Sequence, residues 1–263
     1  MKTLLACLLL FSCSHHSPQP SKNPEEVKTP QLSFSEGDRE FKADLVLPEQ
    51  IAGKLPLVII VHEWWGKNEY VQKRAAMLAQ LGYAALVVDL FGNGEIAASP
   101  EVARTLTSPF YENSNLSIQR LNQYLELARQ DSRLNLDNIY AIGYCFGGTQ
   151  VLNWARSGVE IKGVASFHGS LSSPLQMKAD SPIKILVQNG AADPLVPARD
   201  IKAFKVEMKK AKARLTFHSY KGALHAFTNP DATLLGKRFK MPVAYHEMAD
   251  KASWDELIKF LKN

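Results

Sequence analysis

The sequence predicts one α/β domain with a mostly parallel central sheet and helices on both faces of that sheet. Apolar, strand-like runs alternate along the chain with segments whose apolar residues recur at helical spacing, which is typical of successive βαβ units. Leu57–Val61 and Ala84–Val88 are apolar throughout, as expected of parallel strands covered on both faces. Reactive or charged side chains follow several strands directly, and open α/β sheets bind ligands at that edge.

The elements can be placed in order along residues 31–263, the expected domain. A hairpin is predicted from strands over 31–35 and 39–47, because the second strand alternates apolar and polar residues around one buried face. We expect residues 93–114, which are polar and contain proline, to form a small excursion over the strand ends. The other strands are expected over 57–61, 84–88, 139–144, 162–167, 183–188 and 214–220, with helices over about 69–81, 115–131, 146–156 and 197–210 and a terminal helix from about Pro242.

The first 30 residues have the composition of an export signal and a tether. Lys2 precedes an apolar run that is too short to span a bilayer, so residues 1–13 are interpreted as a signal peptide. Leu10-Phe11-Ser12-Cys13 resembles a lipobox, in which cleavage leaves a lipidated Cys13; an ordinary signal peptide cut near Ser14 is the alternative. Residues 14–30 have the polar composition of a flexible tether. Both alternatives predict an exported bacterial protein, either periplasmic or anchored to a membrane by lipid.

Composition excludes some classes of partner. The net charge of +5 comes from scattered basic residues, and the one local cluster, over 205–214, alternates with apolar residues like an exposed helix face. We therefore expect no nucleic-acid partner. Spaced pairs of His and Cys are lacking, so we expect no metal. We also expect a monomer.

The centre of the chain carries a pattern with a specific chemical use. Gly143-Tyr144-Cys145-Phe146-Gly147 follows an apolar strand and precedes a helix, which is the G-x-S-x-G elbow of an α/β-hydrolase with cysteine in the serine position. Such a turn exposes the nucleophile and aims the next backbone N–H groups at the reacting carbonyl. Cys145 is the only cysteine after the N-terminal segment and cannot form an internal disulfide. A buried cysteine in a glycine-rich turn is the alternative interpretation.

A cysteine nucleophile needs a base, and the base needs an orienting acid. Asp193 follows a strand in a Gly-Ala-Ala-Asp-Pro turn, and His225 follows the last strand. Cys145, Asp193 and His225 thus occur in the order that α/β-hydrolases use. Asp89, which also follows a strand, comes before the elbow, and a structural hydrogen-bonding role fits it better.

Several motifs together resemble one family. They are Val61-His62-Glu63-Trp64-Trp65-Gly66, Asp89-Leu90-Phe91, Gly143-Tyr144-Cys145-Phe146-Gly147-Gly148, Gly190-Ala191-Ala192-Asp193-Pro194 and His225-Ala226-Phe227. They resemble the dienelactone hydrolase family, over about residues 32–261. The resemblance implies an α/β-hydrolase fold, a Cys-Asp-His triad acting on esters or lactones, and no metal or organic cofactor.

The resemblance also implies roles for the loop around Glu63. In the family, a Glu at this position interacts with the resting thiol, and its displacement by substrate helps to generate the thiolate. An anionic carboxylate beside sulfur disfavours a standing thiolate. A partnership between Glu63 and a basic side chain or a backbone donor is the alternative. The oxyanion hole would consist of the backbone N–H groups of Trp64 and Phe146.

The sequence departs from the family where a substrate carboxylate would be held. Family members that act on dienelactone use two arginines, and Asn93 and Asn229 stand at those places. An amide cannot reproduce the charged, bidentate grip of a guanidinium. We therefore expect a neutral or apolar ester, in a pocket that includes Asn93, Asn229 and a set of aromatic residues, namely Trp64, Trp65, Phe91, His168 and Phe227. Trp65 could equally belong to the core. A non-catalytic exported binding protein that retains the hydrolase fold is the alternative function.

Overall fold

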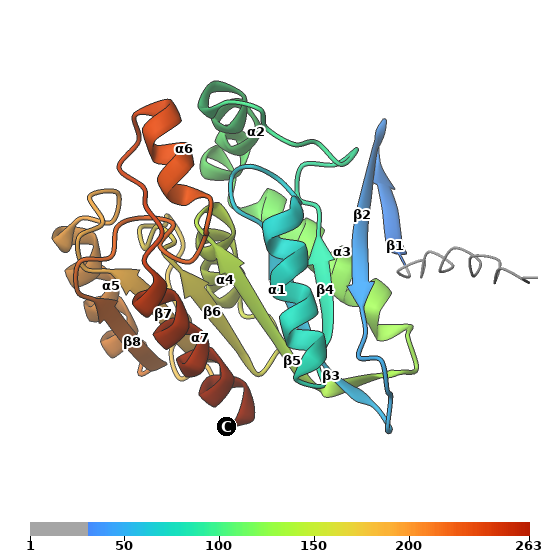
Figure 1. Cartoon of the computed structure of the whole chain (residues 1–263). Coiled ribbons are helices and arrows are strands. Elements are labelled where there is room, and N and C mark those ends of the chain that lie inside the picture. The colour runs from blue at the N-terminus through green and yellow to red at the C-terminus, as the bar shows by residue number, and fades with distance from the viewer. Residues whose placement is uncertain (1–30) are drawn as a thin grey trace, which may run out of the picture.

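A computed structural model describes residues 31–263, so the predictions for the signal peptide, Cys13 and the tether lie outside the described residues. The strands are β1 (Gln31–Glu36), β2 (Arg39–Val46), β3 (Leu55–Val61), β4 (Ala84–Val88), β5 (Leu134–Tyr144), β6 (Gly163–Phe167), β7 (Lys184–Gly190) and β8 (Arg214–Tyr220). They form one sheet in the order β1-β2-β4-β3-β5-β6-β7-β8 (Figure 1). β2 pairs antiparallel with β1 and β4, and all other neighbours are parallel. The expected fold class is confirmed.

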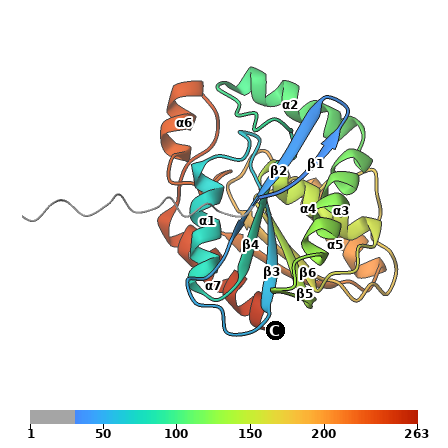
Figure 2. The same ribbon diagram turned by 90° about the vertical axis from the view of Figure 1, so that its right-hand side faces the viewer.

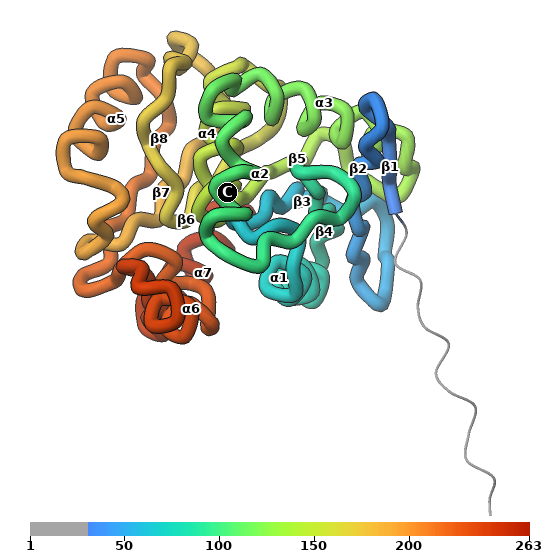
Figure 3. Tube along the Cα trace, turned by 90° about the horizontal axis from the view of Figure 1, so that it is seen from above, coloured from blue at the N-terminus to red at the C-terminus, as the bar shows by residue number. Residues whose placement is uncertain are grey.

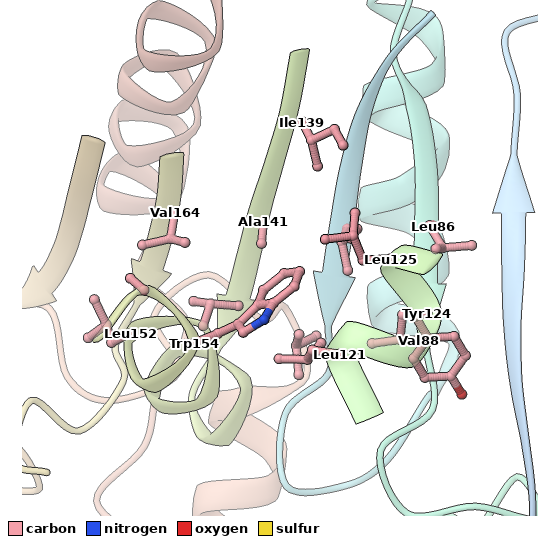
Figure 4. Packing of buried hydrophobic residues seen from close by; sticks show 14 of the residues in the cluster. Leu86, Val88, Leu121, Tyr124, Leu125, Ile139, Ala141, Leu152, Trp154 and Val164 are labelled. Atoms are coloured by element: carbon pink, nitrogen blue, oxygen red, sulfur yellow. The ribbon is translucent and has the colours of Figure 1, made fainter. Parts of the chain in front are cut away.

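Helices cover both faces of the sheet (Figure 2). They are α1 (Glu69–Gln80), α2 (Pro100–Glu112), α3 (Asn115–Arg129), α4 (Phe146–Ser157), α5 (Ala198–Lys210), α6 (Ala232–Phe239) and α7 (Glu247–Lys262). α1 and α7 bury Val71 and Leu257 in the core on one face. On the other face, Trp154 of α4 is fully buried in a cluster with Leu121 of α3 and Ala141 of β5 (Figure 4). Both faces of the central strands are therefore shielded from solvent, which is why those strands are apolar throughout.

The excursion over 93–114 contains a helix, α2, that was not predicted from the sequence. Ser99 caps α2 by accepting a hydrogen bond from the N–H of Val102, and Pro100 occupies the first helical turn, where a missing N–H costs nothing. These start signals lie in the sequence, but the polar composition and the internal Pro109 obscured the helical period.

The C-terminal region also differs from expectation. α6 falls in a stretch for which no helix was predicted, and α7 begins at Glu247 instead of near Pro242. The side chain of His246 caps α7 by accepting a hydrogen bond from the N–H of Ala249. A proline suits the first turn of a helix, but here Pro242 lies in the connection between the two helices.

The two unexpected helices lie together beyond the carboxyl ends of the parallel strands (Figures 1 and 3). Trp65, in the loop after β3, is buried with Ala103 of α2, and Phe239 of α6 packs against the same cluster. This cluster fixes α2 and α6 over the edge of the sheet where the candidate residues end their strands. Within residues 31–263, no helix has the length and apolar character needed to cross a membrane.

Candidate active site

Cys145 lies on a strained turn between β5 and α4. Its backbone angles, φ 53° and ψ −114°, are unfavourable for a residue with a side chain. The flanking glycines make the turn possible. A Cβ on Gly143 would lie 2.1 Å from the carbonyl oxygen of Gly147, and a Cβ on Gly147 would lie 2.3 Å from that of Val61. The elbow is thus pressed against the end of β3, and no larger residue fits at either position.

The structure brings the three predicted triad residues together. His225 Nε2 lies 3.0 Å from Cys145 Sγ, and His225 Nδ1 lies 2.8 Å from Asp193 Oδ2. Asp193 follows β7, and its other oxygen accepts a hydrogen bond from the N–H of Leu195 at 2.8 Å. His225 follows β8 and pairs through its backbone with Val243. A sulfur, an imidazole and a carboxylate therefore form one hydrogen-bonded line, as nucleophilic catalysis requires.

The charges around His225 favour its protonated form. Burial by itself lowers the pKa of His225. The negative charges of Cys145 and Asp193 and their hydrogen bonds to the ring outweigh burial, so the net pKa of His225 lies well above its usual value. An imidazolium between two anions is thereby stabilised. The arrangement can hold a proton on His225 beside the sulfur, where a leaving group will need it.

The expected oxyanion hole consists of the backbone N–H groups of Trp64 and Phe146. Phe146 is the first residue of α4, and Trp64 stands in the loop after β3. Among the described residues, neither amide donates a hydrogen bond to another group. The adjacent Gly147 N–H donates to the carbonyl oxygen of His62 at 3.1 Å, which locks the two loops together. Both residues line the same cavity as Cys145, and donors left unused there are what an oxyanion hole would need.

Glu63 is buried in the same site, with a partner that was not expected. Its Oε2 accepts a hydrogen bond of 2.7 Å from Asn229 Nδ2. The resemblance implied a contact between Glu63 and the resting thiol; in the structure the thiol is instead hydrogen-bonded to His225. Burial, partly offset by Asn229 and by the charge of His225, raises the pKa of Glu63 to about 7. The carboxyl can therefore change its charge near neutral pH.

A cavity of about 600 Å³ opens over Cys145. Its wall includes the expected Glu63, Trp64, Trp65 and Asn229. Exposed Glu101, Arg104 and Lys240 also contribute to the wall. Residues that the sequence analysis did not single out supply much of the rest, among them Tyr111, Leu195, Leu235, Phe239, Met241 and Val243. Most of these belong to α2, to α6 or to the segment after α6. Neither helix was predicted from the sequence.

Phe91, Asn93, His168 and Phe227 were expected in the pocket but do not line this cavity. Phe91 and Phe227 are buried, with Phe91 packed 5.6 Å from the ring of Phe146 and so behind the elbow. Asn93 is exposed at a turn, where its backbone N–H and its Oδ1 both pair with the backbone of Glu40. Each of these three side chains is occupied by packing or by hydrogen bonds outside the cavity wall. His168 is 1% exposed and lies beneath Cys145.

His62 and Asp89 hold the loops around the site. The carboxylate of Asp89 accepts backbone hydrogen bonds from Phe91, Gly92 and Gly94, in keeping with the structural role favoured for it. His62 Nε2 accepts from the N–H of Leu90, so its Nδ1 carries the proton that is donated to the carbonyl oxygen of Glu63 at 2.6 Å. Within residues 31–263, no cluster of three His, Cys, Asp or Glu side chains could hold a metal ion.

The mostly parallel sheet, the elbow after β5, and the acid and histidine after later strands define the class of α/β-hydrolases. The model of the dienelactone hydrolase family matches residues 41–263, and the chain belongs to the dienelactone hydrolase family.

Individual relatives agree with this family. The chain is 26% identical to a probable 2-oxo-3-(5-oxofuran-2-ylidene)propanoate lactonase of Bradyrhizobium sp., over 81% of this chain and 85% of the relative. It is 23% identical to a putative carboxymethylenebutenolidase of Escherichia coli, over 87% and 84% of the two chains. A solved structure named m3DLH is 31% identical and superposes with a TM-score of 0.83, over 89% of this chain and 97% of its own. The protein is a hydrolase that acts on esters or lactones.

Proposed function

We propose that the protein hydrolyses esters or lactones through a covalent thioester on Cys145, with His225 as the acid–base catalyst and Asp193 as the residue that orients it. The observation that carries the proposal is the continuous line of contacts, 3.0 Å from sulfur to imidazole and 2.8 Å from imidazole to carboxylate. Cys145 and His225 lie in the wall of a cavity large enough for a small organic molecule.

The reaction has two halves. The Cys145 sulfur attacks the carbonyl carbon, and the resulting oxyanion is held by the N–H groups of Trp64 and Phe146. The bond to the alcohol oxygen then breaks, and His225 gives that oxygen its proton, which leaves a thioester. In the second half, His225 takes a proton from water as the water attacks the thioester carbonyl. The acid is released, and the Cys145 sulfur and the protonated His225 are restored.

The substrate is proposed to be a neutral or apolar ester. Asn229, at one of the two positions where an arginine would hold a substrate carboxylate, is hydrogen-bonded to Glu63. Asn93, at the other, lies outside the cavity wall. Apolar side chains from α2 and α6 supply much of that wall instead. Exposed Arg104 and Lys240 face the same space, so esters with and without a distal carboxylate should be compared directly.

The nucleophile is tested with Cys145→Ala. We expect turnover of p-nitrophenyl acetate to fall by about 10⁴-fold or more, because removing a triad nucleophile leaves only the contribution of the oxyanion hole and binding. Circular dichroism and the unfolding midpoint should match those of the wild type. Wild-type protein incubated with substrate and quenched in acid should carry an acyl group on Cys145 by mass spectrometry. Unchanged turnover in the variant rules out the mechanism, and a wild type inert to a panel of esters and lactones favours the binding-protein alternative.

We further propose that the protein is an exported monomer with a lipid on Cys13. The support is the apolar run and the lipobox-like Leu10-Phe11-Ser12-Cys13. Mass spectrometry of the N-terminus from membrane fractions should find a diacylated Cys13, and Cys13→Ala should move the protein from the membrane to the soluble fraction. An N-terminus at Ser14 with no lipid would contradict the anchor. Sedimentation of the mature protein in detergent measures the oligomeric state.

A further inference from the structure

His168 joins the nucleophile to the segment that carries the base. It follows β6 directly, is 1% exposed and has a φ of +42°, which is uncommon for a residue other than glycine. The backbone N–H of Cys145 is shared between the carbonyl oxygen of Phe167 at 2.9 Å and His168 Nδ1 at 3.1 Å. On the other side of the ring, His168 Nε2 lies 2.8 Å from Thr228 Oγ1.

The contacts fix the protonation of this imidazole. Since Nδ1 accepts a hydrogen bond from the Cys145 N–H, Nε2 must carry the proton of the neutral ring and donate it to Thr228. A second proton on Nδ1 would face that N–H directly. The groups around the ring agree with a neutral state: burial lowers the pKa of His168 well below its usual value, and the charges of His225 and Arg74 lower it further.

Thr228 is itself held from several directions. Its hydroxyl lies 2.7 Å from the hydroxyl of Tyr70, and its carbonyl oxygen accepts a hydrogen bond of 2.6 Å from Arg74 Nη2. Tyr70 and Arg74 both belong to α1. Thr228 stands three positions after His225 in the same loop, so α1 fixes one end of the segment that carries the base.

We propose that His168 and Thr228 form a clamp that sets the position of His225 relative to Cys145. The clamp, defined as the His168–Thr228 pair with its bond to the Cys145 N–H, rests on the proposed function, because it acts through the nucleophile and the base. The contact between His225 Nε2 and Cys145 Sγ is one point at which the two loops meet. The clamp is a second, non-reacting one, and two points of attachment define a geometry that one cannot.

Neither residue of the clamp lines the cavity, so the expected consequence is specific. Loosening the clamp should lower kcat and leave the binding of substrate nearly unchanged, because a displacement of about 1 Å between reacting groups costs on the order of 100-fold in rate. His168 and Thr228 are positioning residues and do not touch the substrate.

Two variants break the clamp at the same bond. Thr228→Val keeps the shape and removes the hydroxyl. His168→Asn keeps an acceptor near the place of Nδ1, tolerates the positive φ and cannot reach Thr228. Each should lower kcat for p-nitrophenyl acetate by about 10- to 100-fold with KM within about twofold. Thr228→Ser should stay close to the wild type. The double variant should lose no more than the worse single variant, because both changes remove one interaction.

A second measurement needs no ester. The rate at which iodoacetamide alkylates Cys145 reports the sulfur anion that His225 stabilises. At about pH 6.5 the rate should fall about tenfold in Thr228→Val and in His168→Asn. Thr107→Val is the matched control: it removes an equally buried threonine hydroxyl that bonds only to carbonyl groups of its own helix. Thr107→Val should change neither the alkylation rate nor kcat for p-nitrophenyl acetate.

The outcomes separate the clamp from the proposed function. Alkylation rates that coincide in the wild type and both variants would overturn the clamp, as would additive losses in the double variant or a Thr228→Ser that behaves like Thr228→Val. A wild type that is alkylated at Cys145 but hydrolyses no ester would overturn the proposed function, and the alkylation comparison would still decide on the clamp.

Discussion

At the scale of single residues, the buried carboxyl of Glu63 makes stability depend on pH. Burial raises its pKa to about 7 from an ordinary value of 4.5. Between these values the folded protein holds a proton that the unfolded chain has released, so stability falls as pH rises through that window. The stabilisation, about 3 kcal/mol, is fully present below about pH 4.5 and lost above about pH 7.

Glu63→Gln tests this linkage, because glutamine does not titrate. Unfolding free energies from urea titrations at several pH values should show the variant gaining on the wild type by about 3 kcal/mol between pH 4.5 and pH 7.5. Glu112→Gln, at an exposed position, is the control and should run parallel to the wild type. Parallel curves for Glu63→Gln as well would contradict the raised pKa.

The residue scale also shows what sequence could and could not predict. Cys145, Asp193 and His225 were predicted to meet because each lies in the connection after a parallel strand, and the carboxyl ends of such strands share one edge. The contact between Asn229 and Glu63 was not predicted, because the two are far apart along the chain and an amide can bond to almost any polar neighbour. His168 was placed in the pocket because it follows a strand and carries an aromatic ring; its burial beneath the elbow depends on tertiary packing.

At the scale of elements, α2 and α6 shape the cavity. Trp65 and Phe239 lie with ring centroids 5.9 Å apart, joining the loop after β3 to α6. Both residues line the cavity. We expect Phe239→Ala to raise KM about tenfold for a bulky aromatic ester, because apolar contact with substrate is lost, and to change KM for p-nitrophenyl acetate much less.

Leu234→Ala provides the matched control for that comparison. Leu234 is 68% exposed on the same helix and does not line the cavity, so both KM values should stay at the wild-type level. Equal increases for large and small esters in Phe239→Ala would mean that α6 had shifted as a whole and that Phe239 does not contact the acyl or alcohol group selectively.

The central strands and long helices were predictable because burial on both faces of a sheet imposes a clear pattern, as in Leu57–Val61. α2 and α6 were not. They cover the edge of the sheet, where a helix needs few apolar residues, so their helical period is weak. In α6 the exposed Leu234 breaks the expected stripe.

At the scale of the whole molecule, a buried ion pair ties α4 to α5. The side chain of Arg156 is 1% exposed, and its Nε and Nη2 donate to the two oxygens of Glu207 at 2.9 and 2.8 Å. Glu207 also accepts from the N–H of Met177. Glu207→Ala would leave a buried guanidinium unpaired, and we expect unfolding to require about 3 kcal/mol less, measured by urea titration followed by tryptophan fluorescence.

Activity at room temperature should survive that change, since neither residue lines the cavity. The exposed pair of Lys73 and Glu69 offers the control, because both side chains are more than two-thirds exposed. Glu69→Ala should leave the unfolding midpoint unchanged. A Glu207→Ala protein as stable as the wild type would show that the buried pair contributes nothing.

The two N–H groups of the proposed oxyanion hole belong to segments that follow neighbouring strands, Trp64 after β3 and Phe146 after β5. They come into register only when those strands, more than 70 residues apart in the sequence, have paired. The proposed catalysis therefore requires long-range strand pairing, which is slow to form when a chain folds. During refolding from urea, helical signal should return before turnover does, and turnover should return together with the burial of the tryptophans.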